Sequence, residues 1–351
     1  MYDIKSMKEN EIAQIVSHEG EPAFRAGQIF KWLGAGVSSF DEMTNIPLAL
    51  RERLKETCLL YRPKCLNKQV ASDGTVKLLW ELFDKNAIES VVMSYNHGNT
   101  VCISSQVGCR MGCAFCASTR GGLVRNLTAS EMLDQVRYSG FKAEKKISNI
   151  VIMGIGEPLD NFENVIRFLE LVNHPDVLGI GMRHISLSTS GPEGGIRRLA
   201  DEGLQITLSV SLHAPDDATR NIMMPINRKG GVARLIDDCR YYCLKTGRRI
   251  SFEYIMAKGI NDSDTHANSL ITLLNGMSSE LSPLIHVNLI PLNSVEGSAF
   301  RPSDPDRVSA FAEALKKGGI RTTVRRRMGA DIDAACGQLR LKRRAQSPDR
   351  R

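Results

Sequence analysis

Hydrophobic residues follow two different periods along this chain. In the first sixty residues they recur at helical spacing, which predicts a small helical unit built from residues 11–16, 24–33 and 48–60. After that, the pattern changes to short runs rich in Val, Ile and Leu, separated by turn dipeptides such as Asp73-Gly74. These runs predict strands that form a small sheet leading into the main domain, over residues 75–84, 87–95 and 99–107.

From about residue 108 onward, strand-like runs alternate with helical ones. Strands are expected at residues 149–153, 183–188, 205–211, 249–255, 285–290 and 321–325, and helices at residues 129–138, 162–172, 195–201, 232–244, 267–274 and 306–316. Thr128 and Glu131 have the spacing of a capping box at the first of these helices. The alternation predicts a parallel α/β fold, either an open sheet or a partial barrel, in which functional residues follow the strand ends.

The composition is that of an ordinary globular protein, with 351 residues, of which 42% are hydrophobic and 24% charged. No apolar stretch is long enough to cross a bilayer, and the charged N-terminus lacks the apolar run of a secretory signal. We therefore expect a cytoplasmic protein without a membrane partner. The net charge of +7 permits a polyanionic partner, but a basic enzyme without nucleic acid would carry the same charge.

The nine cysteines are an odd number in a chain expected to be cytoplasmic, which favours metal binding or thiol chemistry over a disulfide framework. Three of them, Cys109, Cys113 and Cys116, lie within eight residues, directly before a predicted helical segment. They supply three of the four ligands of a four-iron cluster, which leaves one iron open for a substrate or cofactor. The alternative is structural zinc, but such a site usually needs a fourth Cys or His at a matching spacing.

Ordered matches to one family extend far beyond the cysteine loop. They cover residues 102–109 (CISSQVGC), 125–128 (RNLT), 153–159 (MGIGEPL), 187–191 (LSTSG), 211–213 (SLH), 224–227 (MPIN), 287–293 (VNLIPLN) and 329–339 (GADIDAACGQL). From roughly residue 89 to 339 the chain thus resembles the RlmN/Cfr family of radical S-adenosylmethionine (SAM) RNA methyltransferases, and most closely the RlmN type.

The resemblance implies a partial (β/α)6 radical SAM barrel with a small N-terminal helical domain and a short β-extension. In this chain the helical domain, which would contact RNA, is expected at residues 1–70 and the β-extension at residues 71–107. The radical SAM core with a C-terminal catalytic cysteine loop is expected at residues 108–339, and a basic tail at residues 340–351.

The resemblance also assigns cofactors. Cys109, Cys113 and Cys116 are implied as ligands of one 4Fe-4S cluster per chain. Two SAM molecules would be consumed per methylation, and the implied SAM-binding residues all lie at expected strand ends: Gly156, Glu157, Ser188, Ser211, Leu212, His213 and Asn293. Each of these residues alone is weak evidence for a SAM site, because a Ser after a strand is usually a helix cap.

Three further residues receive catalytic roles from the resemblance. Cys336 would accept a methyl group from one SAM, and a 5′-deoxyadenosyl radical from a second SAM would activate that methyl for attack on adenine. Cys102 would then attack the sulfur of Cys336, forming a disulfide that releases the methylated RNA and needs an external reductant. Glu89 would accept the proton from the target carbon. Without the resemblance, Cys336 reads as a structural cysteine, Cys102 as a possible iron ligand and Glu89 as a solvated strand residue.

The implied substrates are 23S rRNA near the peptidyl-transferase centre and tRNA at the adenosine 3′ of the anticodon. The adenosine must be splayed out or flipped for its ring to be reached. Basic residues near the reactive cysteine are candidates for phosphate contacts, namely Arg325, Arg326, Arg327, Arg340, Lys342, Arg343 and Arg344. A flavodoxin or ferredoxin is the expected electron donor, and the expected state is a monomer.

Two alternatives stay open at this point. A Cfr-type enzyme with the same cysteines and SAM residues would methylate C8 of the ribosomal adenosine and give antibiotic resistance. A non-catalytic RNA-binding protein would use the cysteines for a structural metal, with zinc instead of iron and no role for Cys336.

Overall fold

One ten-stranded sheet forms the frame of the molecule. The computed structural model describes residues 1–293, 299–326, 328, 329, 331, 332 and 339. The strand order is β14-β13-β12-β11-β10-β9-β6-β5-β4-β3. The strands are β3 (Lys64–Val70), β4 (Val76–Glu81), β5 (Ala87–Tyr95), β6 (Gly98–Ile103), β9 (Ile147–Ile152), β10 (Ile185–Thr189), β11 (Thr207–Ser211), β12 (Ile250–Met256), β13 (Ile285–Pro291) and β14 (Arg321–Val324).

Neighbouring strands from β6 through β14 run parallel, whereas β3, β4, β5 and β6 pair antiparallel. The sequence predicted a small sheet that leads into the main domain, but these strands continue the main sheet without a break. The reason is β6, which pairs antiparallel with β5 on one side and parallel with β9 on the other. Any side chain on the antiparallel part is therefore positioned by the same rigid sheet as the parallel part.

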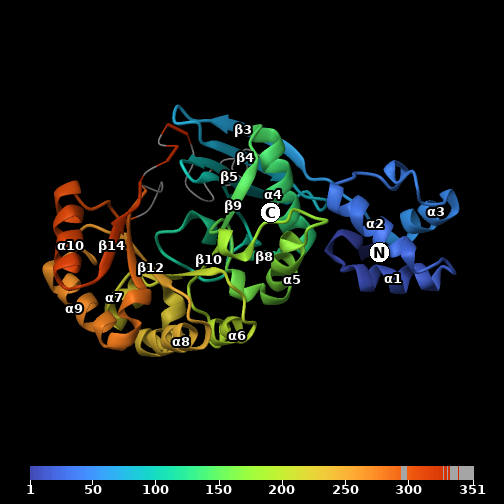
Figure 1. The fold of residues 1–351 in the computed structure, drawn as a ribbon. Helices are drawn as coiled ribbons and strands as arrows, with labels where there is room; N and C mark the ends of the chain where they lie inside the picture. The colour runs from blue at the N-terminus through green and yellow to red at the C-terminus, as the bar shows by residue number, and fades with distance from the viewer. Residues whose placement is uncertain (294–298, 327, 330, 333–338, 340–351) are drawn as a thin grey trace.

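Helices cover the outer face of the curved parallel sheet (Figure 1). They are α4 (Ala129–Ala143), α5 (Phe162–Asn173), α6 (Gly195–Asp201), α7 (Asp217–Met223), α8 (Gly231–Thr246), α9 (Asp264–Asn275) and α10 (Pro305–Lys317). The six helices predicted from periodicity are confirmed, as are the six predicted parallel strands and the capping box of Thr128 and Glu131. Helix α7 was not predicted, because its seven residues are mostly polar. None of these described helices is long and apolar enough to span a membrane.

The N-terminal segment forms a separate group of helices beside α4 and α5 (Figure 1). It contains α1 (Glu9–His18), α2 (Phe24–Ala35) and α3 (Leu48–Thr57), and the short strands β1 (Tyr2–Asp3) and β2 (Cys58–Leu59) pair in parallel. Its apolar side chains belong to the same continuous core as those of α4 and α5. A buried ion pair between Lys5 and Asp134 and two hydrogen bonds from Arg137 to the carbonyls of Leu33 and Gly34 fix it to α4.

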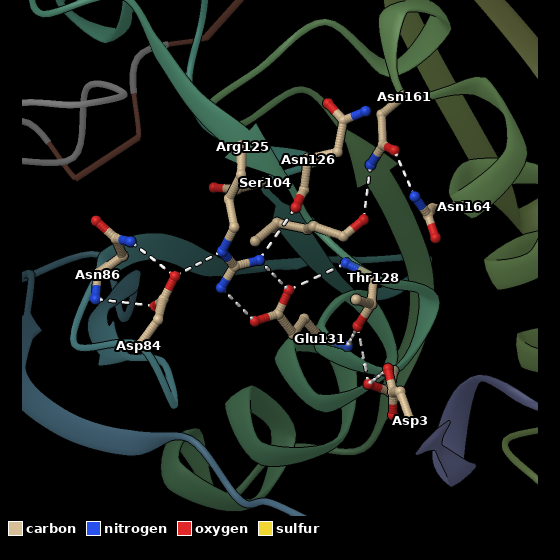
Figure 2. Close-up of polar contacts among 12 residues, drawn as sticks. Asp3, Asp84, Asn86, Ser104, Arg125, Asn126, Thr128, Glu131, Asn161 and Asn164 are labelled. Atoms are coloured by element: carbon tan, nitrogen blue, oxygen red, sulfur yellow. Dashed lines mark hydrogen bonds and ion pairs between the residues drawn. The ribbon is translucent and has the colours of Figure 1, made fainter. Parts of the chain in front are cut away.

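A polar network ties the antiparallel strands to the start of α4 (Figure 2). Its centre is Arg125 on β8 (Leu123–Asn126), which pairs antiparallel with β7 (Gln106–Gly108). Arg125 donates from Nε to Asp84 over 2.6 Å and from both terminal nitrogens to Glu131 over 2.8 Å. Glu131 in turn accepts from the backbone N–H of Thr128 over 3.0 Å. The network therefore fixes the hairpin from which the three-cysteine loop projects.

Candidate active site

The three clustered cysteines lie on the loop between β7 and β8. A short 3-10 helix, Ala117–Thr119, directly follows them. Gly108 has a φ of +84°, and a Cβ there would lie 2.0 Å from the carbonyl oxygen of Gly122, so only glycine permits this close approach. The N–H of Cys109 donates to that same carbonyl over 3.1 Å, and the N–H of Ala114 donates to the carbonyl of Met223 on α7 over 2.9 Å. The loop is thus anchored at its start and at its middle.

The loop and the carboxyl ends of the parallel strands surround one cavity of about 270 Å³. Its wall includes most of the residues singled out from the sequence: Cys109, Cys113, Cys116, Gly156, Glu157, Ser188, Ser211, His213 and Asn293. Of the implied SAM-binding residues, Leu212 is the one absent from this wall, because it is fully buried in the hydrophobic core. Its neighbours Ser211 and His213 face the cavity, as expected when successive side chains along an extended segment alternate in direction.

The three thiols are ligands of the kind that hold an iron–sulfur cluster. Among the described residues, no three Cys, His, Asp or Glu side chains stand close enough together to hold one metal ion. Iron–sulfur clusters are held by Cys thiolates, and this loop supplies three of them. Burial raises the pKa of Cys109 to about 12 and that of Cys113 well above its ordinary value. Both would therefore become thiolates only when a cationic centre binds.

Glu157 is buried, and protein donors occupy both of its carboxylate oxygens. Oε1 accepts from the Thr189 hydroxyl over 2.7 Å and from the Leu159 N–H over 3.0 Å. Oε2 accepts from the Ser190 N–H and hydroxyl, each over 2.8 Å. Burial raises the pKa of this carboxyl, while these hydrogen bonds act in the opposite direction. Glu157 thus ties the end of β10 to the loop after β9.

Gly156 brings its backbone to the cavity wall in a conformation that favours glycine. Its φ is +117°, and a Cβ there would lie 2.7 Å from the backbone nitrogen of Gln106 and from the Ser105 hydroxyl. The side chain of Gln106 is fully buried and accepts the N–H of Glu157 over 2.8 Å. The segment 153–159 is therefore clamped onto the strand that leads to the cysteine loop.

His213 has a left-handed backbone with a φ of +59° and a buried ring. Burial lowers its pKa to about 3, with the positive charge of Arg220 as a second cause, so the ring is neutral at physiological pH. Its Nδ1 accepts the N–H of Ile255 over 3.1 Å, which assigns the proton to Nε2. The ring meets Phe115 of the cysteine loop edge-on, with centroids 5.0 Å apart. His213 therefore contacts both the strand ends and the loop.

Several residues around the cavity were not identified from the sequence. Glu253 on β12 lines the cavity, is buried, and accepts from Asn288 over 2.8 Å. Burial raises the pKa of its carboxyl, while the charge of Arg325 lowers it. A glutamate inside a predicted buried strand was the available signal for this residue. Arg220 and Gln106 act through side-chain contacts between distant segments, and such contacts leave no local pattern.

Cys102 and Glu89 lie on one face of the sheet. Cys102 on β6 is opposite Val91 on β5, and Glu89 is two residues from Val91, so all three point the same way. Glu89 is buried and forms an ion pair of 2.9 Å with Lys77, so it is not a solvated strand residue. Cys102 is buried in a small apolar cluster that Met153 and Met328 complete. Met153 also lines the cavity, so this face adjoins it.

Cys336 lies outside the described residues, as do Arg327, Arg340, Lys342, Arg343 and Arg344. The described residues that precede it are docked on the turn between β3 and β4. The N–H of Gly329 donates to Asp73 over 2.8 Å, and Asp331 accepts the N–H of Ser72 over 2.9 Å. Arg325 lines the cavity.

Two family models match the chain. The model of the radical SAM superfamily matches residues 103–268, and that of the ribosomal RNA large subunit methyltransferase N-terminal domain matches residues 2–60. The first of these ranges contains the cysteine loop and four of the parallel strands that end at the cavity.

Relatives match over almost the whole chain. The chain is 51% identical over 97% of its length to a protein of Alkaliphilus oremlandii described as a probable dual-specificity RNA methyltransferase RlmN, of which 98% is covered. A protein of Clostridium novyi with the same description is 48% identical, with the same coverage of both chains. The crystal structure of a radical SAM methyltransferase from Sphaerobacter thermophilus is 40% identical and superposes with a TM-score of 0.88, over 96% of this chain and 99% of that one. With these relatives and this cavity, the chain belongs to the RlmN family of radical SAM RNA methyltransferases.

Proposed function

We propose that the protein methylates C2 of one adenosine in 23S rRNA and of the adenosine 3′ of the anticodon in tRNA. One observation carries the proposal. The three-cysteine loop and the strand-end residues line a single cavity, and the sheet face bearing Cys102 and Glu89 adjoins that cavity. The dual specificity in the names of its relatives supports both RNA substrates.

In this proposal the cavity holds a 4Fe-4S cluster and SAM together. Cys109, Cys113 and Cys116 would ligate the cluster, and the chemistry that it would supply is one-electron reduction of SAM. The backbone of Gly156, the hydroxyls of Ser188 and Ser211, and Asn293 bind SAM. Glu157 supports SAM binding indirectly, because its carboxylate oxygens accept hydrogen bonds that hold Ser190 and Thr189 in place. His213 offers its Nε2–H as a neutral donor.

Three residues carry the group transfer. Cys336 takes the methyl group of one SAM, with S-adenosylhomocysteine as the leaving group. The 5′-deoxyadenosyl radical from a second SAM would take one hydrogen atom from that methyl group and become 5′-deoxyadenosine. The remaining carbon radical bonds to C2 of the adenine, and the adduct gives up one electron to an acceptor such as the oxidised cluster. Glu89 accepts the proton from C2, and Cys102 attacks the sulfur of Cys336 to release the methylated RNA. The resulting disulfide is reset by an external reductant. The cluster itself is reduced by a low-potential donor such as flavodoxin or ferredoxin.

The test is reconstitution of the protein under anaerobic conditions, followed by reaction with a 23S rRNA fragment and with tRNA. The RNA is digested, and 2-methyladenosine is separated from 8-methyladenosine by chromatography and mass spectrometry. We expect 2-methyladenosine from both RNAs. A product that is 8-methyladenosine would assign the chain to Cfr-type chemistry, and a colourless protein that binds zinc would overturn the enzymatic proposal altogether.

A variant of Cys102 tests the order of the steps. With Cys102→Ala, we expect a covalent protein–RNA adduct to accumulate, because the sulfur of Cys336 is no longer attacked. The adduct is visible as a shifted band on a denaturing gel. Free methylated RNA at the normal rate from Cys102→Ala would contradict the assigned role of Cys102.

A further inference from the structure

Arg220 on α7 is a buried cation that has no role in the proposed reaction. Its side chain is 1% exposed. Nε donates to the carbonyl of Leu212 over 3.0 Å, and Nη2 donates to the carbonyls of Ser211 and Ser190 over 3.0 and 2.9 Å. Nη1 donates to the side-chain oxygen of Asn227 over 2.7 Å. One guanidinium thus joins the carboxyl ends of β10 and β11 to the segment after α7.

All four acceptors of Arg220 are neutral groups. Burying a charge is costly unless an opposite charge compensates it, and carbonyl dipoles compensate only part of that cost. The nearby carboxylate of Asp217 is directed elsewhere, since its Oδ1 accepts from Asn227 over 2.8 Å and from the N–H of Val232 over 2.7 Å. Burial lowers the pKa of Arg220 to about 10, so the guanidinium still carries its charge at neutral pH. The carboxylate of Asp217 compensates part of this charge through Asn227, and an anionic group bound beside the cysteine loop would add to that compensation.

The same helix also anchors the cysteine loop. The last residue of α7, Met223, accepts the N–H of Ala114 from the middle of that loop. Met223 packs in a small apolar cluster that includes Cys113 and Phe115. Arg220 lies one helical turn before Met223 on the same helix. Helix α7 therefore links the strand ends, through Arg220, to the thiol-bearing loop, through Met223.

We propose that Arg220 is a positioning residue that fixes the SAM-binding strand ends and supplies the buried positive charge facing an anionic iron–sulfur cluster. The inference rests on the proposed function. Three thiolates make a bound 4Fe-4S centre anionic, and each added electron makes it more so. A fixed cation nearby favours the reduced form and raises the reduction potential. In that step a low-potential one-electron donor is oxidised and the cluster is reduced, with no bond made or broken and no proton transferred.

The experiment compares Arg220→Gln, Arg220→Lys and a matched control, Arg137→Gln. Arg137 is also a guanidinium that donates to two backbone carbonyls, but it lies at the junction with the N-terminal helices. Each protein is reconstituted with iron and sulfide under anaerobic conditions. The measurements are iron content, the midpoint potential followed by electron paramagnetic resonance, the dissociation constant of SAM, and the thermal midpoint without the cluster.

We expect Arg220→Gln to shift the midpoint potential to a more negative value and to weaken SAM binding about tenfold or more. Arg220→Lys keeps the positive charge but loses the planar set of guanidinium N–H donors. The midpoint potential of the cluster therefore stays near that of the wild type, while SAM binding weakens. Arg137→Gln lowers the thermal midpoint and leaves the midpoint potential and the dissociation constant of SAM unchanged. If Arg220→Gln does not fold, the SAM affinity of Arg220→Lys decides the positioning role.

The inference is overturned if the Arg220 variants fold, take up the cluster and match Arg137→Gln in potential and SAM affinity. That outcome leaves the proposed function intact. A wild-type protein that takes up no iron–sulfur cluster would instead overturn both the proposed function and the inference that rests on it.

Discussion

Two arginines near the cysteine loop, the half-buried Arg125 and the buried Arg220, are held by opposite kinds of partner. Arg125, behind the β7–β8 hairpin, is held by the carboxylates of Asp84 and Glu131, and these two carboxylates raise its pKa above the ordinary value (Figure 2). Arg220, behind the cavity, is held by carbonyls and an amide, and burial lowers its pKa to about 10. The first charge is hydrogen-bonded directly to carboxylates, whereas the second is hydrogen-bonded only to neutral groups, with the carboxylate of Asp217 one residue further away through Asn227.

The difference separates a structural region from a functional one. A charge matched by opposite charges holds segments together and has little effect on a ligand. A charge with neutral partners keeps its field, and in a low-dielectric cavity that field acts on whatever binds there. The comparison predicts that variants around Arg125 change stability, while variants around the cavity change cofactor binding and activity.

The largest expected effect comes from the thiols at the cavity. Cys113→Ala removes one of three candidate cluster ligands, and we expect methylation to fall by at least about a thousandfold because the electron source is lost. Iron content and visible absorption of the reconstituted protein are the measurements. Cys65→Ala on β3, half-buried and outside the cavity wall, is the control and should retain iron. Full iron content in Cys113→Ala would remove this cysteine from the ligand set.

Breaking the network of Figure 2 should affect stability and not cofactor binding. Arg125→Met leaves the carboxylates of Asp84 and Glu131 without their cation, and we expect the free energy of unfolding to fall by about 3 kcal/mol. Denaturant unfolding measures this loss. The dissociation constant of SAM for the folded, reconstituted protein should stay within about twofold of the wild type. A large loss of SAM affinity without a loss of stability would contradict the comparison.

His213 makes the free energy of unfolding depend on pH. Its folded pKa of about 3 lies below the unfolded value of about 6.5, so the stabilising contribution is fully present above pH 6.5 and declines as the pH falls toward 3. Relative to His213→Gln, the wild type should lose about 1.4 kcal/mol of unfolding free energy for each pH unit below about 6. Urea unfolding between pH 7 and pH 5 is the measurement. Parallel curves for the two proteins would show that the ring is not held neutral.

The smallest effect is expected at an exposed ion pair. Arg198 on α6 and Glu163 on α5 are paired with their side chains 52% and 77% exposed. Arg198→Ala should change the free energy of unfolding by less than about 0.5 kcal/mol, because water and salt screen such pairs. The same urea titration provides the value. A loss of unfolding free energy as large as that of Arg125→Met would mean that an ion pair stabilises this protein equally whether it is exposed or partly buried.

Periodicity was enough to predict the parallel sheet and most of its helices, because those segments are long and bury one face. Helix α7 was missed since its polar sequence has no apolar stripe, and it is stabilised by its cap and by the buried side chain of Arg220. The boundary of the antiparallel strands was also misjudged. Only the pairing of β6 with both β5 and β9 joins them to the main sheet, and that pairing is a long-range property.

At the site, the order of motifs located the residues around the cavity but not their individual tasks. Glu157 was implied as a SAM-binding residue, and in the structure its carboxylate accepts hydrogen bonds from Thr189, Ser190 and Leu159. Leu212 was implied as a SAM-binding residue by the resemblance, and its side chain is buried in the core. In both cases side-chain direction decided the outcome, and side-chain direction follows from packing that a linear motif does not contain.

The most direct test of the account is the mass of the methyl group delivered from SAM whose methyl carries three deuterium atoms. If Cys336 carries the methyl and one of its hydrogens is removed before it bonds to adenine, the product retains two deuterium atoms and the third position is filled from solvent. The 5′-deoxyadenosine formed alongside then contains one deuterium, and Cys336→Ala gives no product. Three deuterium atoms in the methylated adenosine would indicate direct transfer and would contradict the account.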